Sequence, residues 1–412
     1  MGLRSEAAEL YSKEVEAPFP LEEYIRRRIK VRQLMDREKI DLLYCTSPES
    51  LFYLTGYESN QYQQECPIGV LPVSGIAIKQ DTDKVILFDS EAEEIKARTY
   101  TVGTDIRIFH AKSRFPGLDF IVENLKAEKW LKGTIGLEKW SNRPNPATSE
   151  MFQAALENEG CKVVDGTAVV REVRMIKSPQ EMVYTRTAAQ IADIGLKAAV
   201  DHIKPGVTEI DVRAEIDYAC AKAGGEVPAE PVFFHAGPRS TRTHAPPTRH
   251  IVMPGDILYL NLCGVYHRYH ADIARTLSLG EPNHKVAKQI ALAVKSWPML
   301  LKEISPNRSF SDFNKLVEDH YREAGIWEDR WFVGGYELGI AFLPDWVGVF
   351  HLGPGFDSEG RCFLPGMVID YEADFYLPLG AGQCTISDTI AINKDSTEIL
   401  STIPPDLIVL ST

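Results

Sequence analysis

The chain has 412 residues, which is long for one domain, so we expect two domains. Its apolar content of 44% and charged content of 25% are ordinary for a soluble globular protein. The net charge of −13 argues against a nucleic-acid partner, because sequence-independent binding to phosphates requires a basic surface.

No apolar run is long enough to cross a bilayer, and the first residues lack the apolar core of a signal peptide. The seven cysteines are scattered and never spaced as Cys-x-x-Cys, which is typical of reduced thiols. We therefore expect a cytoplasmic protein that does not bind membranes.

The first part of the chain alternates between predicted helices and predicted strands up to about residue 164. Apolar residues at helical spacing predict an amphipathic helix over residues 21–38, and turn residues at 47–50 follow a short strand. The predicted strands are 40–45, 69–73, 75–79 and 84–88. This order indicates an α/β domain, which we place at residues 1–168.

A strong helix start marks the second domain, residues 169–412. Ser178 at the N-cap, Pro179 at the first helical position and Glu181 at the third form a predicted capping box. Beyond it, predicted helices (about 179–203, 208–223, 282–304 and 309–324) alternate with strand-rich stretches (231–235, 257–278, 367–376 and 384–393).

Several motifs resemble those of the creatinase/prolidase/methionine-aminopeptidase superfamily. They are Leu51–Tyr57 ("YLTG"), Arg174–Glu181 ("R-x-I-K-S-x-x-E"), Ile257–Thr276 and Pro365–Glu372. The resemblance implies an α/β (α+β) protein with a small N-terminal α/β domain. It also implies a C-terminal "pita-bread" catalytic domain, in which helices cover a curved antiparallel sheet.

In the metallopeptidases of this superfamily, two Asp, one His and two Glu hold a pair of divalent cations. The resemblance puts Asn261, Asp272, Tyr336, Glu372 and Ser387 at those five positions. Only Asp272 and Glu372 keep a carboxylate, and two hard cations need more negative charge than that. We therefore expect no metal and no cofactor, as in creatinase and ectoine hydrolase.

His244 is the candidate acid–base residue. By itself, a histidine in a loop is usually a surface residue. In creatinase-like enzymes, however, a histidine in the corresponding loop acts as general base and acid, and the near-neutral pKa of imidazole suits that task. His235 falls on a predicted strand, where a structural role is expected.

Acidic residues alternate along one predicted strand. Asp370, Glu372 and Asp374 would share one face, which is either exposed to solvent or at the mouth of a pocket. A buried carboxylate without a metal needs a cationic partner, such as an amidinium or guanidinium substrate. Ser387 replaces a Glu, and we do not expect Asp388 to compensate, because adjacent strand residues point to opposite faces.

Further residues are expected to bind a zwitterionic or cationic small molecule. Tyr336 and Trp346 would form an aromatic wall, unless they are core residues. In creatinase-like dimers a loop of the N-terminal domain reaches the partner's active site. The resemblance therefore implies a homodimer, in which a polar loop with Tyr62 and Gln64 reaches the partner's active site. The alternative is that this segment is an ordinary surface loop. The expected substrate-binding residues are Asn261, His270, Tyr336, Trp346, Tyr62 and Gln64.

The sequence thus predicts a metal-independent hydrolase of a non-peptide C–N bond in an amidine or guanidine compound, similar to ectoine hydrolase or creatinase. His244 would activate water and protonate the leaving nitrogen, while Glu372 and Asp272 hold the cationic nitrogens. Two alternatives remain open. One is an Xaa-Pro-type metallopeptidase or a lyase with a degenerate metal site built from Asp272, Glu372 and His351. The other is a binding protein without catalysis.

Overall fold

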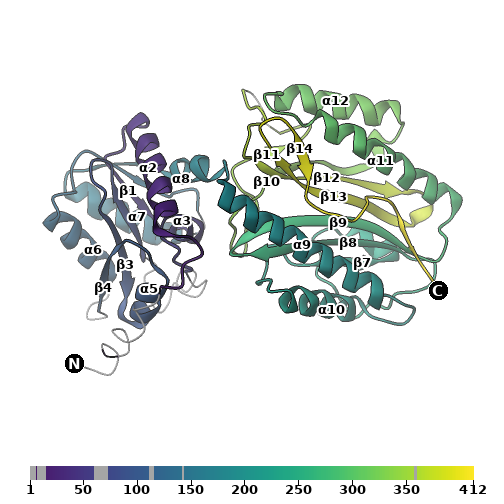
Figure 1. Cartoon of the computed structure of the whole chain (residues 1–412), viewed down its shortest axis with the longest axis horizontal. Coiled ribbons are helices and arrows are strands. Elements are labelled where there is room, and N and C mark those ends of the chain that lie inside the picture. Colours follow the sequence, from purple (N-terminus) through teal and green to yellow (C-terminus); the bar gives the residue numbers. More distant parts are fainter. Residues whose placement is uncertain (1–5, 7–14, 60–72, 111–115, 142, 357–359) are drawn as a thin grey trace. The chain divides into compact units, whose positions relative to one another are not determined.

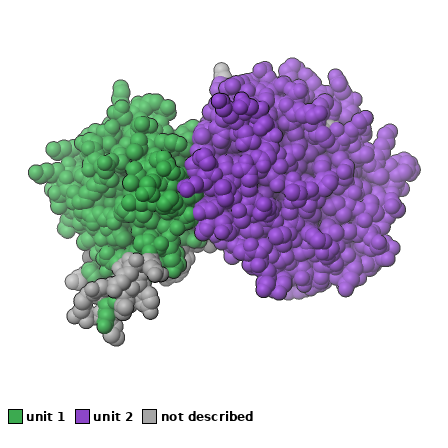
Figure 2. All heavy atoms as spheres, viewed as in Figure 1, with its two compact units in different colours: residues 1–174 green, residues 175–412 purple. Residues whose placement is uncertain are grey.

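The structure is a computed structural model that describes residues 6, 15–59, 73–110, 116–141, 143–356 and 360–412. The chain divides into two compact units, residues 1–174 and 175–412 (Figure 2), and each is described by itself. Among the described residues, no helix has the length and apolar character needed to span a bilayer.

Within the described residues, the first unit contains a six-stranded mixed sheet with strand order β4-β3-β2-β1-β5-β6. The β1–β2 and β2–β3 pairs are antiparallel, and the β3–β4, β1–β5 and β5–β6 pairs are parallel. Its elements are α2 (Leu21–Arg37), β1 (Leu42–Cys45), α3 (Pro48–Thr55), β2 (Gly75–Lys79), β3 (Val85–Ser90), η1 (Glu91–Glu93), α5 (Glu94–Tyr100), β4 (Asp105–Phe109), α6 (Pro116–Ala127), β5 (Thr134–Leu137), α7 (Pro146–Asn158), β6 (Lys162–Asp165) and α8 (Thr167–Arg174).

The segment read as a turn at 47–50 begins a helix instead. The Ser47 side chain accepts a hydrogen bond from the Ser50 backbone N–H, so Ser47 is the N-cap of α3. The helix ends at Gly56, whose φ of 83° is left-handed and where a Cβ would come within 2.7 Å of the Tyr24 hydroxyl. Of the predicted strand 69–73, residues 69–72 lie outside the described residues, and Val73 is not in a strand.

The first helix of the second unit begins with the predicted capping box. The Ser178 hydroxyl accepts from the Glu181 N–H, and the Glu181 carboxylate accepts from the Ser178 N–H, which completes the capping box of α9. The elements of this unit are α9 (Pro179–His202), α10 (Glu209–Lys222), β7 (Phe233–Ala236), η2 (Gly237–Thr241), β8 (Ile257–Tyr266), β9 (Tyr269–Leu279), α11 (His284–Glu303), α12 (Phe310–Glu323), η3 (Trp327–Asp329), β10 (Arg330–Glu337), β11 (His351–Leu352), β12 (Val368–Leu377), η4 (Pro378–Gly380), β13 (Gly382–Ile392), β14 (Thr397–Ile399) and β15 (Ile408–Leu410).

In the described part of this unit, one nine-stranded sheet runs in the order β11-β10-β12-β13-β9-β8-β7, with β14 paired to β13 and β15 to β9. Two helix pairs cover it (Figure 1). The helices α9 and α10 pack on β7–β9, and α11 and α12 pack on β10, β12 and β13. The α/β class, with helices over an antiparallel sheet in the second unit, is confirmed.

The strand registers align the site residues in one row across the sheet. Glu372 lies opposite Ser387, Ser387 opposite Ala274, and Ala274 opposite Asn261. Side chains alternate along strands, so this row faces away from the strand residues that pack under the helices, such as Tyr371 beneath Trp297. The sheet thus separates a helix-covered face from a face that carries the site.

Candidate active site

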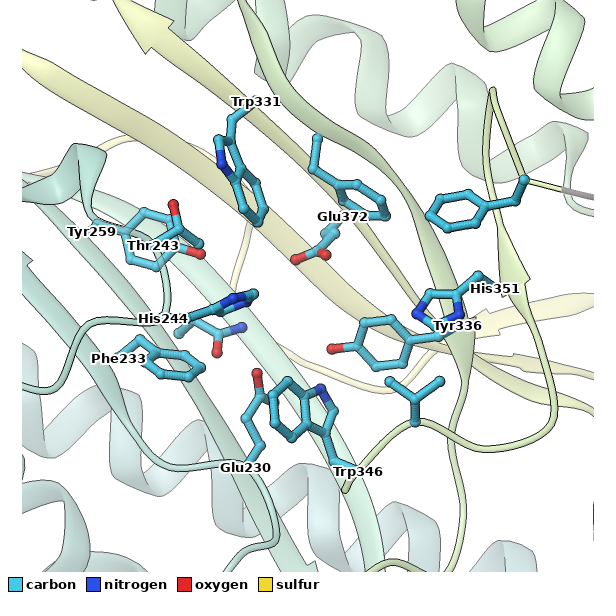
Figure 3. Close-up of a pocket in the computed structure, with 14 residues that line it drawn as sticks. Glu230, Phe233, Thr243, His244, Tyr259, Trp331, Tyr336, Trp346, His351 and Glu372 are labelled. Atoms are coloured by element: carbon cyan, nitrogen blue, oxygen red, sulfur yellow. The ribbon is translucent and has the colours of Figure 1, made fainter. Parts of the chain in front are cut away.

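A pocket with about 580 Å³ of empty space, partly open to solvent, lies on the site face of the sheet. Figure 3 shows the side chains of His244, Glu372 and Tyr336 pointing into the same space from different sides. The remaining lining residues are mostly aromatic: Phe233, Tyr259, Trp331, Phe332, Trp346 and Phe356, with Glu230, Thr243, Asn261, Val347 and His351.

His244 stands in the loop after η2 and has a left-handed φ of 67°, which is uncommon for a residue other than glycine. Its ring centroid lies 5.2 Å from that of Phe233, 5.5 Å from Trp331 and 6.2 Å from Trp346. Partial burial lowers the pKa of the imidazole below its usual value. His244 is therefore held among aromatic rings in its neutral form, which is ready to accept a proton.

The loop that carries His244 is fixed from both sides. His235 on β7 is buried, and its Nε2–H donates to the carbonyl of Ala245 at 2.7 Å. The Thr243 hydroxyl donates to Gln383 on β13 at 3.2 Å. His235 has the structural role that its strand position suggested, because it anchors the residue next to His244.

Four of the residues at the five metal positions of the superfamily make hydrogen bonds with one another or with a neighbouring carboxylate. The Tyr336 hydroxyl and the Asn261 amide donate hydrogen bonds to Asp272, and the Ser387 hydroxyl donates to Asp370. Burial raises the pKa of the Tyr336 phenol well above its usual value, so it stays neutral. Each of these substituted residues donates a hydrogen bond to a carboxylate, whereas a metal ligand would offer a lone pair to the cation. The arrangement does not fit a pair of divalent cations.

The acidic face of β12 is buried, which rules out the solvent-exposed reading. Asp370 and Asp374 are fully buried, and Glu372 between them is partly buried. Burial raises the pKa of Asp272 to about 6 and that of Asp374 to about 7. Burial and the charge of Asp374 raise the pKa of Glu372 well above its ordinary value. Among the described residues, no lysine or arginine forms an ion pair with these carboxylates. The cluster therefore favours a cation or shared protons.

Two residues that sequence reasoning missed complete the surroundings of Asp272. Glu230, just before β7, and Cys263 on β8 each have a potential ligand atom close to Asp272, with all of these atoms within 4.8 Å of one another. Cys263 lies directly opposite Asp272 in the β8–β9 register. Its position two residues after Asn261 on the same strand could have revealed it, but we interpreted the cysteines only as reduced thiols.

The remaining predicted substrate-binding residues fall in different places. Trp346 is in the pocket wall, and its indole N–H is buried without a partner. His270 is fully buried and does not line the pocket. Its Nε2 accepts from the Ala229 N–H, and its Nδ1–H donates to the Arg268 carbonyl, both at 2.9 Å. Tyr62 and Gln64 lie outside the described residues.

Asp388 and His351 are the last two candidate replacements for the missing metal ligands. Asp388 faces the helices, where Arg275 contacts it at 2.8 Å and the Trp297 indole N–H donates to it at 2.7 Å. It does not replace the missing Glu at Ser387, as the strand alternation predicted. His351 lies at the pocket edge, opposite Tyr336 in the β10–β11 register and stacked on Phe356.

Comparison with known proteins shows the family. Residues 184–394, just over half of the chain, match Metallopeptidase family M24. The chain belongs to this family. Residues 27–176 match the Creatinase/Prolidase N-terminal domain. The N-terminal domain and the pita-bread domain that follows it are therefore both matched.

Relatives of similar length support the same assignment to M24. The chain is 24% identical to the uncharacterized peptidase YqhT of Bacillus subtilis, over 92% of this chain and 99% of the relative. It is 26% identical to the Xaa-Pro dipeptidase of Pyrococcus horikoshii, over 92% and 97%. Among solved structures, the Xaa-Pro dipeptidase from Bacillus anthracis shares the fold with a TM-score of 0.80 at 21% identity, covering 94% of this chain and all of that one.

These relatives correct our functional expectation. We expected a metal-independent hydrolase of a non-peptide C–N bond, similar to ectoine hydrolase or creatinase, and this expectation is wrong. The M24 family is one of metallopeptidases, and Xaa-Pro dipeptidases are among the relatives. We had inferred the reaction from substitutions at three of the five metal positions, which do not determine the bond that is cleaved. That inference also overlooked the donor atoms of Glu230 and Cys263.

Proposed function

We propose that this chain is a peptidase that hydrolyses small peptides of the Xaa-Pro type. The observation that carries the proposal is the convergence of His244, Glu372 and several aromatic rings on one pocket of an M24 fold. Peptide hydrolysis needs a base for the attacking water and an acid for the leaving nitrogen. The relatives named as Xaa-Pro dipeptidases support the choice of substrate.

The pocket suits the proline ring and the ammonium group of such a dipeptide. The proline ring is apolar and compact, and Phe233, Trp331 and Trp346 offer it ring faces around His244. The ammonium group of the first residue would pair with Glu372, one of the two carboxylates that line the same pocket. An ammonium there also relieves the repulsion between Glu372 and the buried carboxylates beside it.

The proton transfers are assigned to His244. Neutral imidazole takes a proton from a water molecule as its oxygen attacks the carbonyl carbon of the first residue. The same imidazole then returns the proton to the proline nitrogen, and the C–N bond breaks to release the first amino acid and free proline. No step in this scheme is assigned to a cation at the five superfamily positions, because the residues there do not fit a pair.

The experiment is a comparison of Ala-Pro with Ala-Ala, incubated with the protein and separately with added Mn²⁺ or Zn²⁺. Faster release of free amino acids from Ala-Pro than from Ala-Ala supports the proposal. Absence of hydrolysis of both dipeptides under every condition overturns it.

A second candidate is a peptide-binding protein without turnover, because Asn261, Tyr336 and Ser387 occupy metal-ligand positions. Calorimetric binding of Ala-Pro with no release of proline would favour it. We also expect a homodimer, and that expectation stays a prediction, which the molar mass in solution will test.

A further inference from the structure

A sulfur and two carboxylates meet beside the pocket, and two of these three residues, Glu230 and Cys263, lie outside the five superfamily positions. Glu230 precedes β7, Cys263 is on β8, and Asp272 is opposite Cys263 on β9. The Cys263 Sγ lies 3.0 Å from Glu230 Oε2, and one donor atom of each residue falls within 4.8 Å of the others. All three side chains are buried. Strands β8 and β9 and the segment before β7 therefore bring three potential ligand atoms close together.

A neighbouring amide provides an independent sign of a missing partner. Asn261 is 2% exposed and lies two residues before Cys263, so both side chains are on the same face of β8. Its Nδ2 donates to the two oxygens of Asp272 at 3.0 and 3.1 Å, while its Oδ1 is buried without a hydrogen-bond partner. A buried carbonyl oxygen without a donor or cation is costly, so a donor or cation is expected beside the Asn261 side chain.

The buried carboxyl groups of Glu230 and Asp272 can be neutralised either by a proton that they share or by a cation. In the part of the chain that the structure describes, no lysine or arginine forms an ion pair with Glu230 or Asp272. Two buried carboxylates without a counter-charge are unfavourable, and one divalent cation would neutralise both. Magnesium and calcium prefer oxygen ligands alone, whereas sulfur together with carboxylate oxygens is a donor set for zinc or a similar transition metal.

We propose that Glu230, Cys263 and Asp272, with the Asn261 carbonyl oxygen, bind a single thiophilic divalent cation of the zinc class. The site shares Asn261 and Asp272 with the superfamily positions but takes its sulfur and second carboxylate from Cys263 and Glu230, which lie outside them. Glu230 (Figure 3) and Asn261 also line the pocket, so the cation would border the space proposed for the substrate. The inference does not rest on the proposed peptidase activity, because its test measures binding.

The test uses the full-length protein, freed of metal by a chelator and titrated with Co²⁺. Cobalt bound by a thiolate gives an intense charge-transfer absorption in the near ultraviolet, whereas cobalt bound by oxygens alone does not. We expect one cobalt per chain together with this absorption. Zn²⁺ should displace the cobalt and abolish the band.

Cys263→Ser is the diagnostic variant, and Cys384→Ser is its control, since Cys384 is equally buried in the same sheet but faces the helix-covered core. Cys263→Ser should lose the band and bind Zn²⁺ at least about 10-fold more weakly, the loss reported even for residues that only support metal ligands. Cys384→Ser should retain both properties.

The proposal is overturned if wild-type protein binds cobalt without the absorption, if it binds none, or if Cys263→Ser keeps the band. Should Cys263→Ser fail to fold, the wild-type titration still decides, because the absorption alone reports sulfur ligation. Metal binding without hydrolysis of Ala-Pro would leave this site standing and remove the proposed function. Hydrolysis of Ala-Pro without the cobalt band would support the proposed function and overturn this metal site.

Discussion

The hydroxyl of Tyr336 donates a hydrogen bond of 3.1 Å to Oδ2 of Asp272, although Tyr336 stands where metallopeptidases of the superfamily carry a histidine ligand. The contact links β10 to β9 across the buried acidic face. A former ligand position has thus become a hydrogen-bond donor that stabilises a carboxylate.

Removing this contact should cost stability. Tyr336→Phe leaves Asp272 with one donor fewer in a buried setting, so we expect the free energy of unfolding to fall by about 1–3 kcal/mol. Urea unfolding monitored by tryptophan fluorescence measures the change. Tyr371→Phe is the matched control, because the Tyr371 hydroxyl is equally buried but has no hydrogen-bond partner. Equal losses in both variants would contradict the role assigned to the Tyr336 contact.

His244→Ala should remove the proton carrier of the proposed hydrolysis. We expect kcat for Ala-Pro to fall by about 10²–10⁴-fold, the usual contribution of acid–base catalysis, with a smaller change in KM. His351→Ala, at the edge of the same pocket, should change kcat much less. If His244→Ala retains more than about a tenth of the wild-type kcat, His244 is not the acid–base residue.

His235 should act as a positioning residue for His244. His235→Phe keeps a flat ring but loses the hydrogen bond to the Ala245 carbonyl, so the His244 loop is held less firmly. A lost hydrogen bond of about 1 kcal/mol predicts a fall in kcat of roughly 5- to 10-fold with little change in KM. His235→Gln, which can still donate, should recover most of the rate. A loss of thermal stability without a change in kcat would show a purely structural role.

His270 should make stability depend on pH. Burial lowers its pKa from 6.5 to about 3, so the folded protein binds fewer protons here than the unfolded chain. The contribution of neutral His270 is complete above pH 6.5 and is lost as the pH falls towards 3. Relative to His270→Gln, wild-type protein should lose about 1.4 kcal/mol of unfolding free energy per pH unit between pH 6.5 and 4.5. A difference between the two proteins that does not vary with pH would refute this assignment.

The sequence was sufficient where local rules determine structure. The structure contains the predicted capping box at Ser178 and Glu181. It also places Asp370, Glu372 and Asp374 on one face of β12, as the alternation of side chains along a strand predicts. The Ser47 segment was misread because the residues that favour turns also cap helices.

The pocket itself could be predicted only in part, because its residues meet through strand pairing. Cys263 reaches Asp272 across β8 and β9, and Glu230 approaches from the chain before β7. Likewise, Trp331 meets the ring of His244 although it lies on β10, far along the chain. Periodicity within one segment carries no information about such neighbours. The reaction could not be inferred from the substituted positions, since one scaffold serves several chemistries.

The most direct test of the central claim is the hydrolysis of Ala-Pro in water enriched in ¹⁸O, with the products analysed by mass spectrometry. Attack of water on the peptide carbonyl predicts that ¹⁸O enters the carboxylate of the released alanine and is absent from the proline. His244→Ala, prepared identically, measures the background from contaminating peptidases and should release proline far more slowly. Absence of labelled alanine from wild-type protein, or equal release by the variant, would contradict the proposal that this pocket is a peptidase site.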